Sequence, residues 1–233
     1  LHQQSKQGPD NNHKGVEIGG NHNGNEYNGF GILTQGSNMQ NILLAAGLGS
    51  RSEGKKLLLP YQGETLVHHA VKESLLAGLY TVLVTGYKAD EVKEAVKDLY
   101  CDNLLVVHNS EYAQGQGSST RCGAFYLREE ESFFISLSDM PLIKARHYHH
   151  LVRYATHAAA RPSYKGRLGH PVFLAPTFLS VIRDRNGPFT MRSLLSSYEV
   201  QAIEVDEEAY ILDIDTLDEY HALLASGQPP QSP

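Results

Sequence analysis

The sequence has little cysteine, no surplus of basic residues and no long apolar run. Its two cysteines, Cys101 and Cys122, form no C-x-x-C motif and are too few for a disulfide framework, which favours a reducing cytoplasm. The net charge of −6 gives no electrostatic preference for nucleic acid or a membrane surface, and no apolar run approaches a membrane span. We therefore expect a cytoplasmic protein without nucleic-acid or membrane partners.

The two ends of the chain differ in composition from its middle. Residues 1–38 are rich in Asn, Gln, Gly and His and lack the basic start and apolar core of a signal peptide. Such a stretch cannot bury enough apolar surface to offset its ordering entropy, so it is predicted to be a flexible leader, natural or left by cloning, with Met39 as a native start. Residues 226–233 are predicted to be a flexible tail, which leaves 39–225 for one folded domain.

Apolar runs of strand length alternate with helical patterns along this domain. The pattern predicts helices over 65–79, 90–99, 118–127 and 217–225, and strands over 40–45, 81–85, 104–107, 133–137, 172–174 and 211–214. Strands that alternate with helices imply right-handed crossovers. The predicted class is therefore α/β, with a mainly parallel sheet that carries helices on both faces.

A glycine-rich turn with two cations follows the first predicted strand. Gly47 and Gly49 allow a tight turn with exposed N–H groups, and Arg51 and Lys56 add positive charge, which suits a polyphosphate. The turn is not a P-loop, because Lys56 stands where that motif needs Ser or Thr. It is not a dinucleotide fingerprint either, because Ser52 replaces the third glycine. The alternative is an ordinary strand-to-helix turn with solvated charges.

Carboxylates follow the fourth predicted strand and the last one. Asp139 should lie at the carboxyl edge of the sheet, facing the phosphate-binding turn, where it is a candidate Mg²⁺ ligand. Asp213 and Asp215 share one face if the strand 211–214 continues, and paired carboxylates can also hold a metal. The alternatives are helix capping by Asp139 and by Asp215 or Thr216, and we expect the second capping interaction in any case.

Two further stretches carry charge or histidine. The helix predicted after Pro141 contains His147, His149, His150 and His157, whose spacing is not that of a closed zinc site, so we expect a solvated helix face. The segment 164–171 is a basic, glycine-bearing loop that could bind an anionic substrate or form a plain hairpin turn.

These features together resemble the molybdenum cofactor cytidylyltransferases and their nucleotidyltransferase relatives, over about residues 39–223. Seven motifs occur in the family's order: Leu44-Ala45-Ala46-Gly47 with Arg51, Lys56-Leu57-Leu58-Leu59-Pro60, Val84-Thr85-Gly86, Gly117-Ser118-Ser119 with Gly123, Asp139-Met140-Pro141, Gly169-His170-Pro171-Val172, and Asp213-Ile214-Asp215-Thr216. The resemblance implies a Rossmann-like nucleotidyltransferase domain of the glycosyltransferase-A type over 39–225.

The same resemblance assigns roles to individual residues. It implies nucleotide binding by Leu44, Ala45, Ala46, Gly47, Gly49, Ser50, Gly86, Ser118 and Ser119. It implies catalytic roles for Arg51, Lys56 and Asp139, with Mg²⁺ held by Asp139 and Asp215 and with His170 facing the acceptor. The family often has glycine where this chain has Glu53, which leaves the register of the turn open.

The implied reaction is Mg²⁺-dependent transfer of CMP from CTP to the terminal phosphate of a molybdopterin-type cofactor, with release of pyrophosphate. CTP is implied because guanylyl relatives have Gly-Gly where this chain has Ala45 and Ala46, and the methyl of Ala46 would crowd a purine. The implied partner is a molybdoenzyme or its maturation chaperone. Two alternatives stay open: transfer to a sugar phosphate or alditol phosphate, and a non-catalytic nucleotide-binding module that delivers cofactor.

Overall fold

The computed structural model describes residues 39–47 and 56–226, and all statements on structure below concern these residues. The predicted leader, the predicted tail beyond Ser226, and Gly49, Ser50 and Arg51 lie outside the described residues. Within the described part of the chain, no helix is both long enough and apolar enough to span a membrane.

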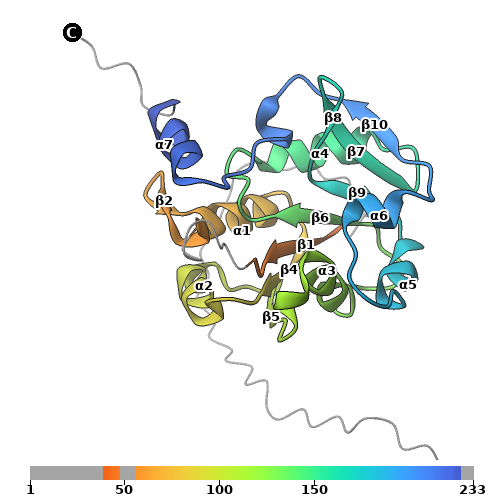
Figure 1. The fold of residues 1–233 in the computed structure, drawn as a ribbon, viewed down its shortest axis with the longest axis horizontal. Helices are drawn as coiled ribbons and strands as arrows, with labels where there is room; N and C mark the ends of the chain where they lie inside the picture. Colours follow the sequence, from red (N-terminus) through yellow and green to blue (C-terminus); the bar gives the residue numbers. More distant parts are fainter. Residues whose placement is uncertain (1–38, 48–55, 227–233) are drawn as a thin grey trace, which may run out of the picture. The chain divides into compact units, whose positions relative to one another are not determined.

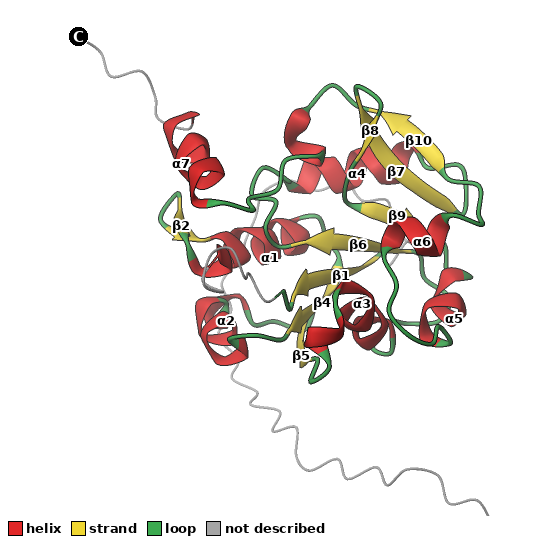
Figure 2. Cartoon of the chain, in the orientation of Figure 1, coloured by secondary structure: helices red, strands yellow, loops and turns green. Residues whose placement is uncertain are grey.

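An eight-stranded sheet forms the centre of the described chain (Figures 1 and 2). Its strands are β1 (Gln40–Ala45), β4 (Tyr80–Thr85), β5 (Leu104–His108), β6 (Phe133–Leu137), β7 (Ala159–Tyr164), β8 (Arg167–Leu168), β9 (Val172–Leu174) and β10 (Gln201–Glu204). The strand order is β10-β7-β9-β6-β1-β4-β5, and β8 pairs with β7. A separate hairpin consists of β2 (Pro60–Tyr61) and β3 (Glu64–Thr65).

Most neighbouring strands are parallel, as predicted. Strands β6, β1, β4 and β5 are parallel neighbours, and β10 is parallel to β7. Strand β9 runs antiparallel to both β6 and β7. In the central register, Leu44 lies opposite Val84 on one side and Leu137 on the other, so the carboxyl ends of β1, β4 and β6 meet at one edge of the sheet. This edge carries the residues that follow these strands, including Asp139.

Helices cover both faces of the sheet (Figure 2). They are α1 (Leu66–Leu76), α2 (Ala89–Ala95), α3 (Gln116–Ala124), α4 (Ala145–Tyr154), α5 (Phe178–Arg183), α6 (Met191–Leu195) and α7 (Leu217–Ser226). Because successive side chains of a strand point to opposite faces, β1 contributes to two cores. Ile42 and Leu44 pack in the core that contains residues of α3, α5 and α6, whereas Leu43 and Ala45 pack with residues of α1 and α2.

The first helix ends earlier than its apolar pattern predicts. Thr65 caps α1, because its hydroxyl accepts a hydrogen bond from the His68 N–H at 3.3 Å. The helix was predicted to reach residue 79 but ends at Leu76. Gly78 then adopts a positive φ of 75° and donates its N–H to the carbonyl of Leu75, a turn that glycine accommodates without strain.

Two local predictions are wrong. Residues 211–214 form no strand; they follow a 3₁₀ turn, Glu208–Tyr210, and the buried Ile214 packs beside α7 rather than in the sheet. The histidines of α4 are not all solvated: His147 is 1% exposed, and its ring accepts from the Lys144 N–H and contacts Glu207.

Candidate active site

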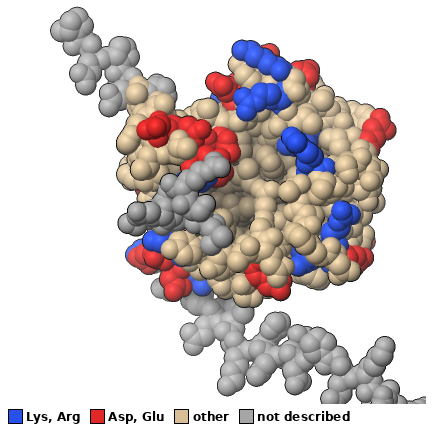
Figure 3. Space-filling model, in the orientation of Figure 1, with Lys and Arg blue, Asp and Glu red and all other residues tan. Residues whose placement is uncertain are grey.

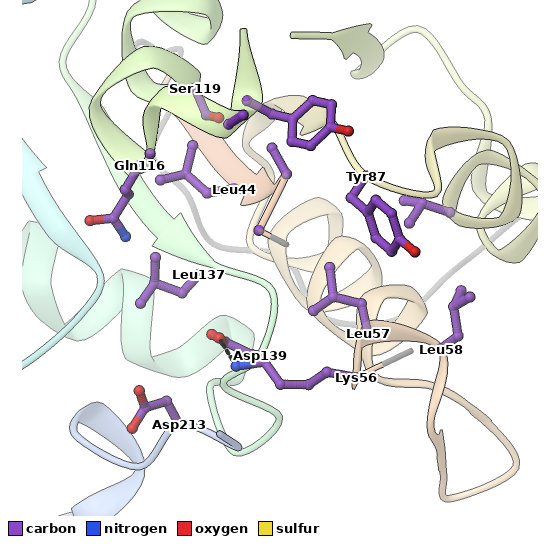
Figure 4. Close-up of a pocket in the computed structure, with 16 residues that line it drawn as sticks. Leu44, Lys56, Leu57, Leu58, Tyr87, Gln116, Ser119, Leu137, Asp139 and Asp213 are labelled. Atoms are coloured by element: carbon purple, nitrogen blue, oxygen red, sulfur yellow. Dashed lines mark ion pairs between the residues drawn. The ribbon is translucent and has the colours of Figure 1, made fainter. Parts of the chain in front are cut away.

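A cavity of 340 Å³ opens at the carboxyl edge of the parallel strands (Figure 4). Seven residues that the sequence nominated line it: Leu44, Ala46, Gly47, Lys56, Ser119, Asp139 and Asp213. They come from the end of β1 and the residues after it, the 3₁₀ turn Lys56–Leu58, α3, the loop after β6 and the segment before α7. The fold thus brings together side chains that lie far apart in the sequence.

One end of the cavity is formed by charged groups. The Lys56 Nζ lies 2.7 Å from an oxygen of Asp139 and 2.8 Å from an oxygen of Asp215. Its side chain is only 13% exposed. Burial lowers the pKa of Lys56, but the charges and hydrogen bonds of Asp139 and Asp215 outweigh that effect and leave the pKa above its ordinary value. The ammonium group therefore stays charged at neutral pH.

Asp139 retains an oxygen that could bind a metal. Its Oδ1 is buried and has no hydrogen-bond partner among the described residues. A buried carboxylate oxygen without a partner is costly, and a hard divalent cation is a suitable ligand for it. The described residues contain no group of three or more His, Cys, Asp or Glu side chains arranged for a metal. The two carboxylates Asp139 and Asp215 do not form such a group, and they are compatible only with an ion such as Mg²⁺ that takes most of its ligands from water or phosphate.

Asp213 lines the cavity beside this charged end. Burial raises the pKa of Asp213, and the negative charges of Asp139 and Asp215 raise it further. The segment after the 3₁₀ turn Glu208–Tyr210 brings Asp213 to the cavity and Asp215 to Lys56. The shared strand face predicted for these carboxylates had assumed a strand over 211–214, which does not form.

The opposite part of the cavity is apolar. Leu57, Leu58 and Tyr87 lie on the side away from Asp213 in Figure 4, and Val92 of α2 also lines the cavity. Tyr87 is 37% exposed, and its hydroxyl has no hydrogen-bond partner within the part of the chain that the structure describes. One end thus suits a polyphosphate, and the other suits a ring with an apolar face.

Three nominated nucleotide-binding residues lie outside the cavity lining. Ala45 faces the core under α1 and α2. Gly86 lies where a Cβ would come within 2.6 Å of the Tyr112 Cβ and 2.8 Å of the Ala46 carbonyl oxygen, so close packing alone requires glycine there. The hydroxyl of Ser118 is buried among backbone and side-chain partners, which include the amide of Asn109. Their nucleotide contacts remain predictions.

His170 also lies away from the 340 Å³ cavity. Its Nδ1 is 3.3 Å from the Ile135 carbonyl oxygen, and burial, with a smaller effect of Arg161, lowers the pKa of His170 to about 4. It lines a second cavity of 760 Å³ together with Arg161, Arg167 and Arg192, and Gln116 lines both cavities. Figure 3 shows a hollow in this face with acidic side chains on one side and basic side chains on the other. The acceptor role of His170 stays a prediction.

Sequence reasoning missed several residues of the lining. Tyr87 directly follows the nominated Gly86, and Gln116, the first residue of α3, stands between Gly115 and Gly117, so their positions could have suggested them. Tyr112 belongs to a 3₁₀ turn, Tyr112–Gln114, that had no motif of its own. Aromatic residues outside a motif give no local signal of a site.

Comparisons with known proteins identify relatives along most of the chain. The model of the MobA-like NTP transferase domain matches residues 41–202. A molybdenum cofactor cytidylyltransferase of Escherichia coli K12 is 29% identical over 179 residues, which cover 77% of this chain and 92% of that protein. A nicotine blue oxidoreductase of Paenarthrobacter nicotinovorans is 28% identical over 201 residues, which cover 78% and 95% of the two chains.

Solved structures show the same fold. The protein Rv0371c of Mycobacterium tuberculosis H37Rv superimposes with a TM-score of 0.69 at 24% identity, over 81% of this chain and 98% of that one. A nucleotidyl transferase from Methanothermobacter gives a TM-score of 0.69 at 21% identity, over 82% and 98% of the two chains. The family model covers well over half of the sequence, and the chain belongs to the MobA-like NTP transferase family, whose members are nucleotidyltransferases.

Proposed function

We propose that the protein transfers CMP from CTP to the terminal phosphate of a molybdopterin-type cofactor, with Mg²⁺ as the metal and pyrophosphate as the second product. The observation that carries this proposal is the cluster of Lys56, Asp139 and Asp215 at one end of a cavity whose other end is apolar. The name of the E. coli relative supports the choice of cytidylyl group and of acceptor.

The reaction needs no nucleophile from the protein. The acceptor phosphate is already an anion, and its oxygen forms a bond to the α-phosphorus of CTP as the bond to the leaving pyrophosphate breaks. The protein contributes orientation and charge stabilisation. Lys56 supplies a fixed positive charge beside the phosphates, because the neighbouring carboxylates keep its pKa high.

Asp139 and Asp215 are the residues that would hold Mg²⁺. When bound, the ion neutralises phosphate oxygens and makes the α-phosphorus more electrophilic. The unpartnered Oδ1 of Asp139 supports this assignment. Among the solved structures of the same fold, a Rv0371c structure with 24% identity and a TM-score of 0.66 is described as a complex with manganese.

The base of the nucleotide and the acceptor are assigned to two different cavities. Ala46 lines the cavity, so its methyl group can limit the size of the base, which favours cytosine over a purine. The 760 Å³ cavity next to it carries three arginines, Arg161, Arg167 and Arg192, and suits an acceptor with negative charge beyond the transferred phosphate. This favours a molybdopterin-type acceptor over an alditol phosphate. The product would pass to a molybdoenzyme or its maturation chaperone in the cytoplasm.

The test is a screen for pyrophosphate release. CTP, GTP, ATP and UTP are each combined with a molybdopterin acceptor, a sugar phosphate or an alditol phosphate, with and without Mg²⁺. We expect release with CTP, the molybdopterin acceptor and Mg²⁺ together. A wild-type preference for GTP would contradict the cytidylyl assignment, and CTP binding without pyrophosphate release would support a delivery module instead.

Asp139→Ala tests the metal assignment in the same assay. We expect turnover to fall by at least about 100-fold with the fold intact, because a metal ligand is lost. Asp218→Ala is the matched control, since Asp218 is an exposed carboxylate of α7 without a polar partner among the described residues. Turnover of nicotine blue without pyrophosphate release would point to the chemistry named for the second relative.

A further inference from the structure

Asp215 reaches the active site without support from the sheet. It follows an extended segment that belongs to no strand, and it directly precedes the first turn of α7. Its carboxylate nevertheless lies 2.8 Å from the Lys56 Nζ. The backbone of such a residue is not held by the hydrogen bonds of a strand or helix, and conformational entropy favours many backbone conformations. Other contacts must therefore fix the backbone if the side chain is to stay within hydrogen-bond distance of Lys56. The structure shows where these contacts come from.

The carboxylate of Glu219 holds the backbone at Asp215. Its Oε2 accepts hydrogen bonds from the N–H groups of Asp215 and Thr216, both at 2.8 Å, and from the Thr216 hydroxyl at 3.0 Å. The Thr216 hydroxyl oxygen in turn accepts the Glu219 N–H at 3.2 Å. Thr216 and Glu219 thus form a capping box at the start of α7, and Glu219 also accepts the N–H of the preceding residue, Asp215. These hydrogen bonds lower the pKa of Glu219 and keep it ionised.

Helix α7 is itself fixed to the segments that carry Lys56 and Asp139. The Tyr220 hydroxyl donates to the Pro60 carbonyl oxygen at 2.5 Å, four residues after Lys56. The Tyr220 ring packs in a small core with β2 and α1, which explains why Figure 1 shows α7 beside β2. On the other side, the Ile214 N–H donates to the Asp139 carbonyl oxygen at 3.0 Å. Helix α7 and the segment that leads into it therefore contact the backbone at Pro60, close to Lys56, and at Asp139, and they hold the backbone of Asp215.

We infer that Glu219 is a positioning residue for the transfer reaction and that α7 is part of the active-site framework. Glu219 touches no reacting atom; it fixes the backbone of Asp215, and thereby the carboxylate that faces Lys56 and the metal. This inference rests on the proposed function for its kinetic readout. Its metal-binding readout is independent of which acceptor the enzyme uses.

The experiment compares three variants of the full-length chain. Glu219→Ala removes the acceptor, Glu219→Gln keeps one oxygen that can accept the same N–H groups, and Asp218→Ala removes an equal charge from the same turn. Mn²⁺ serves as the probe, and its dissociation constant is measured by electron paramagnetic resonance of the free ion. Activity is measured as kcat and KM for CTP. Thermal unfolding curves of each variant identify an assay temperature at which all of them stay folded.

For Glu219→Ala we expect about tenfold weaker Mn²⁺ binding and about tenfold lower kcat, because loss of an outer partner of a metal ligand typically costs 10–100-fold. KM for CTP should change less than threefold. Glu219→Gln should recover most of the loss, and Asp218→Ala should match the wild type.

The inference is overturned if Glu219→Ala lowers only the unfolding temperature, or if Asp218→Ala weakens Mn²⁺ binding equally. If the wild type releases no pyrophosphate, the proposed function fails, while the Mn²⁺ comparison still decides the positioning role.

Discussion

At the scale of the single residue, the charge balance around Lys56 determines what the cavity accepts. One ammonium group faces Asp139 and Asp215, and Asp213 lies close enough for their charges to raise its pKa. The described cluster therefore has a surplus of negative charge. A free triphosphate would be repelled by it, whereas a divalent cation between the carboxylates and the phosphates would reduce this repulsion.

The methyl group of Ala46 offers a test of base choice. Ala46→Gly removes this methyl from the cavity lining, so GTP should be used better and CTP somewhat worse. The change in preference should correspond to about 1–3 kcal/mol, because one methyl-sized difference in a pocket discriminates no more strongly. The measurement is the ratio of kcat/KM for CTP and GTP in both proteins. An unchanged ratio would mean that Ala46 does not border the base.

The buried ring of His170 makes stability depend on pH. Its pKa is about 4 in the folded protein, against an ordinary value of 6.5, so between these values the unfolded chain binds more protons. The contribution of His170 to the free energy of unfolding is therefore complete above pH 6.5. It is lost as the pH falls toward 4, and the total loss is about 3 kcal/mol.

Urea unfolding of the wild type and His170→Gln between pH 4 and 7.5 measures this effect. The free energy of unfolding of His170→Gln should depend less steeply on pH than that of the wild type. His157→Gln, which changes an exposed histidine, should keep the pH dependence of the wild type. Identical slopes in the wild type and His170→Gln would contradict the assignment.

At the scale of the element, the apolar pattern predicted the bounds of some strands and missed others. Strands β1, β6 and β9 begin and end where the sequence predicts. Each contains buried apolar residues, such as Ile42, Leu43 and Leu44 of β1. Strand β7 was missed because Arg161, Pro162 and Ser163 interrupt any apolar alternation. The predicted strand 211–214 failed for the opposite reason: its buried apolar residue Ile214 packs beside α7, and a local pattern does not reveal the packing partner.

Two glycines at the ends of neighbouring strands should respond differently to the same change. Gly86→Ala places a methyl against the Tyr112 side chain and the Ala46 carbonyl, so the free energy of unfolding should fall by about 1–3 kcal/mol. Gly47→Ala meets nothing within 4 Å and should leave stability nearly unchanged, but its methyl enters the cavity lining and should weaken nucleotide binding. Urea unfolding and nucleotide titration separate the effects. Equal stability losses would show that Gly86 has no special packing role.

At the scale of the whole molecule, the site depends on contacts that no local window contains. Lys56 and Asp215 are 159 positions apart, and they meet because the sheet and α7 fix both ends of the domain. The sequence suggested Lys56 through its cationic turn and Asp215 through its pairing with Asp213, but only the family resemblance placed the two residues in one site. The aromatic residues of the cavity lining were not predicted, because none of the family's motifs includes them.

The leader gives a prediction at the same scale. Removal of residues 1–38 should leave both the unfolding temperature and the turnover unchanged, because their composition cannot supply a packed core. Differential scanning fluorimetry and the pyrophosphate assay on the shortened chain provide the measurement. A fall of several degrees would show that the leader packs on the domain.

The reversed direction of β9 has a consequence for how this surface can change. An antiparallel strand starts at the edge where its neighbour β6 ends, so Gly169 and His170 reach that edge through a tight connection from β8 instead of a crossover helix. This connection is joined to the sheet, because the Gly169 N–H donates to the Pro162 carbonyl oxygen of β7 at 2.8 Å and the His170 Nδ1 lies 3.3 Å from the Ile135 carbonyl oxygen of β6. Sequence variation on this rim should therefore concentrate in the exposed residues 165–168, while the strands that lead to Ala46, Gly86 and Asp139 keep their positions.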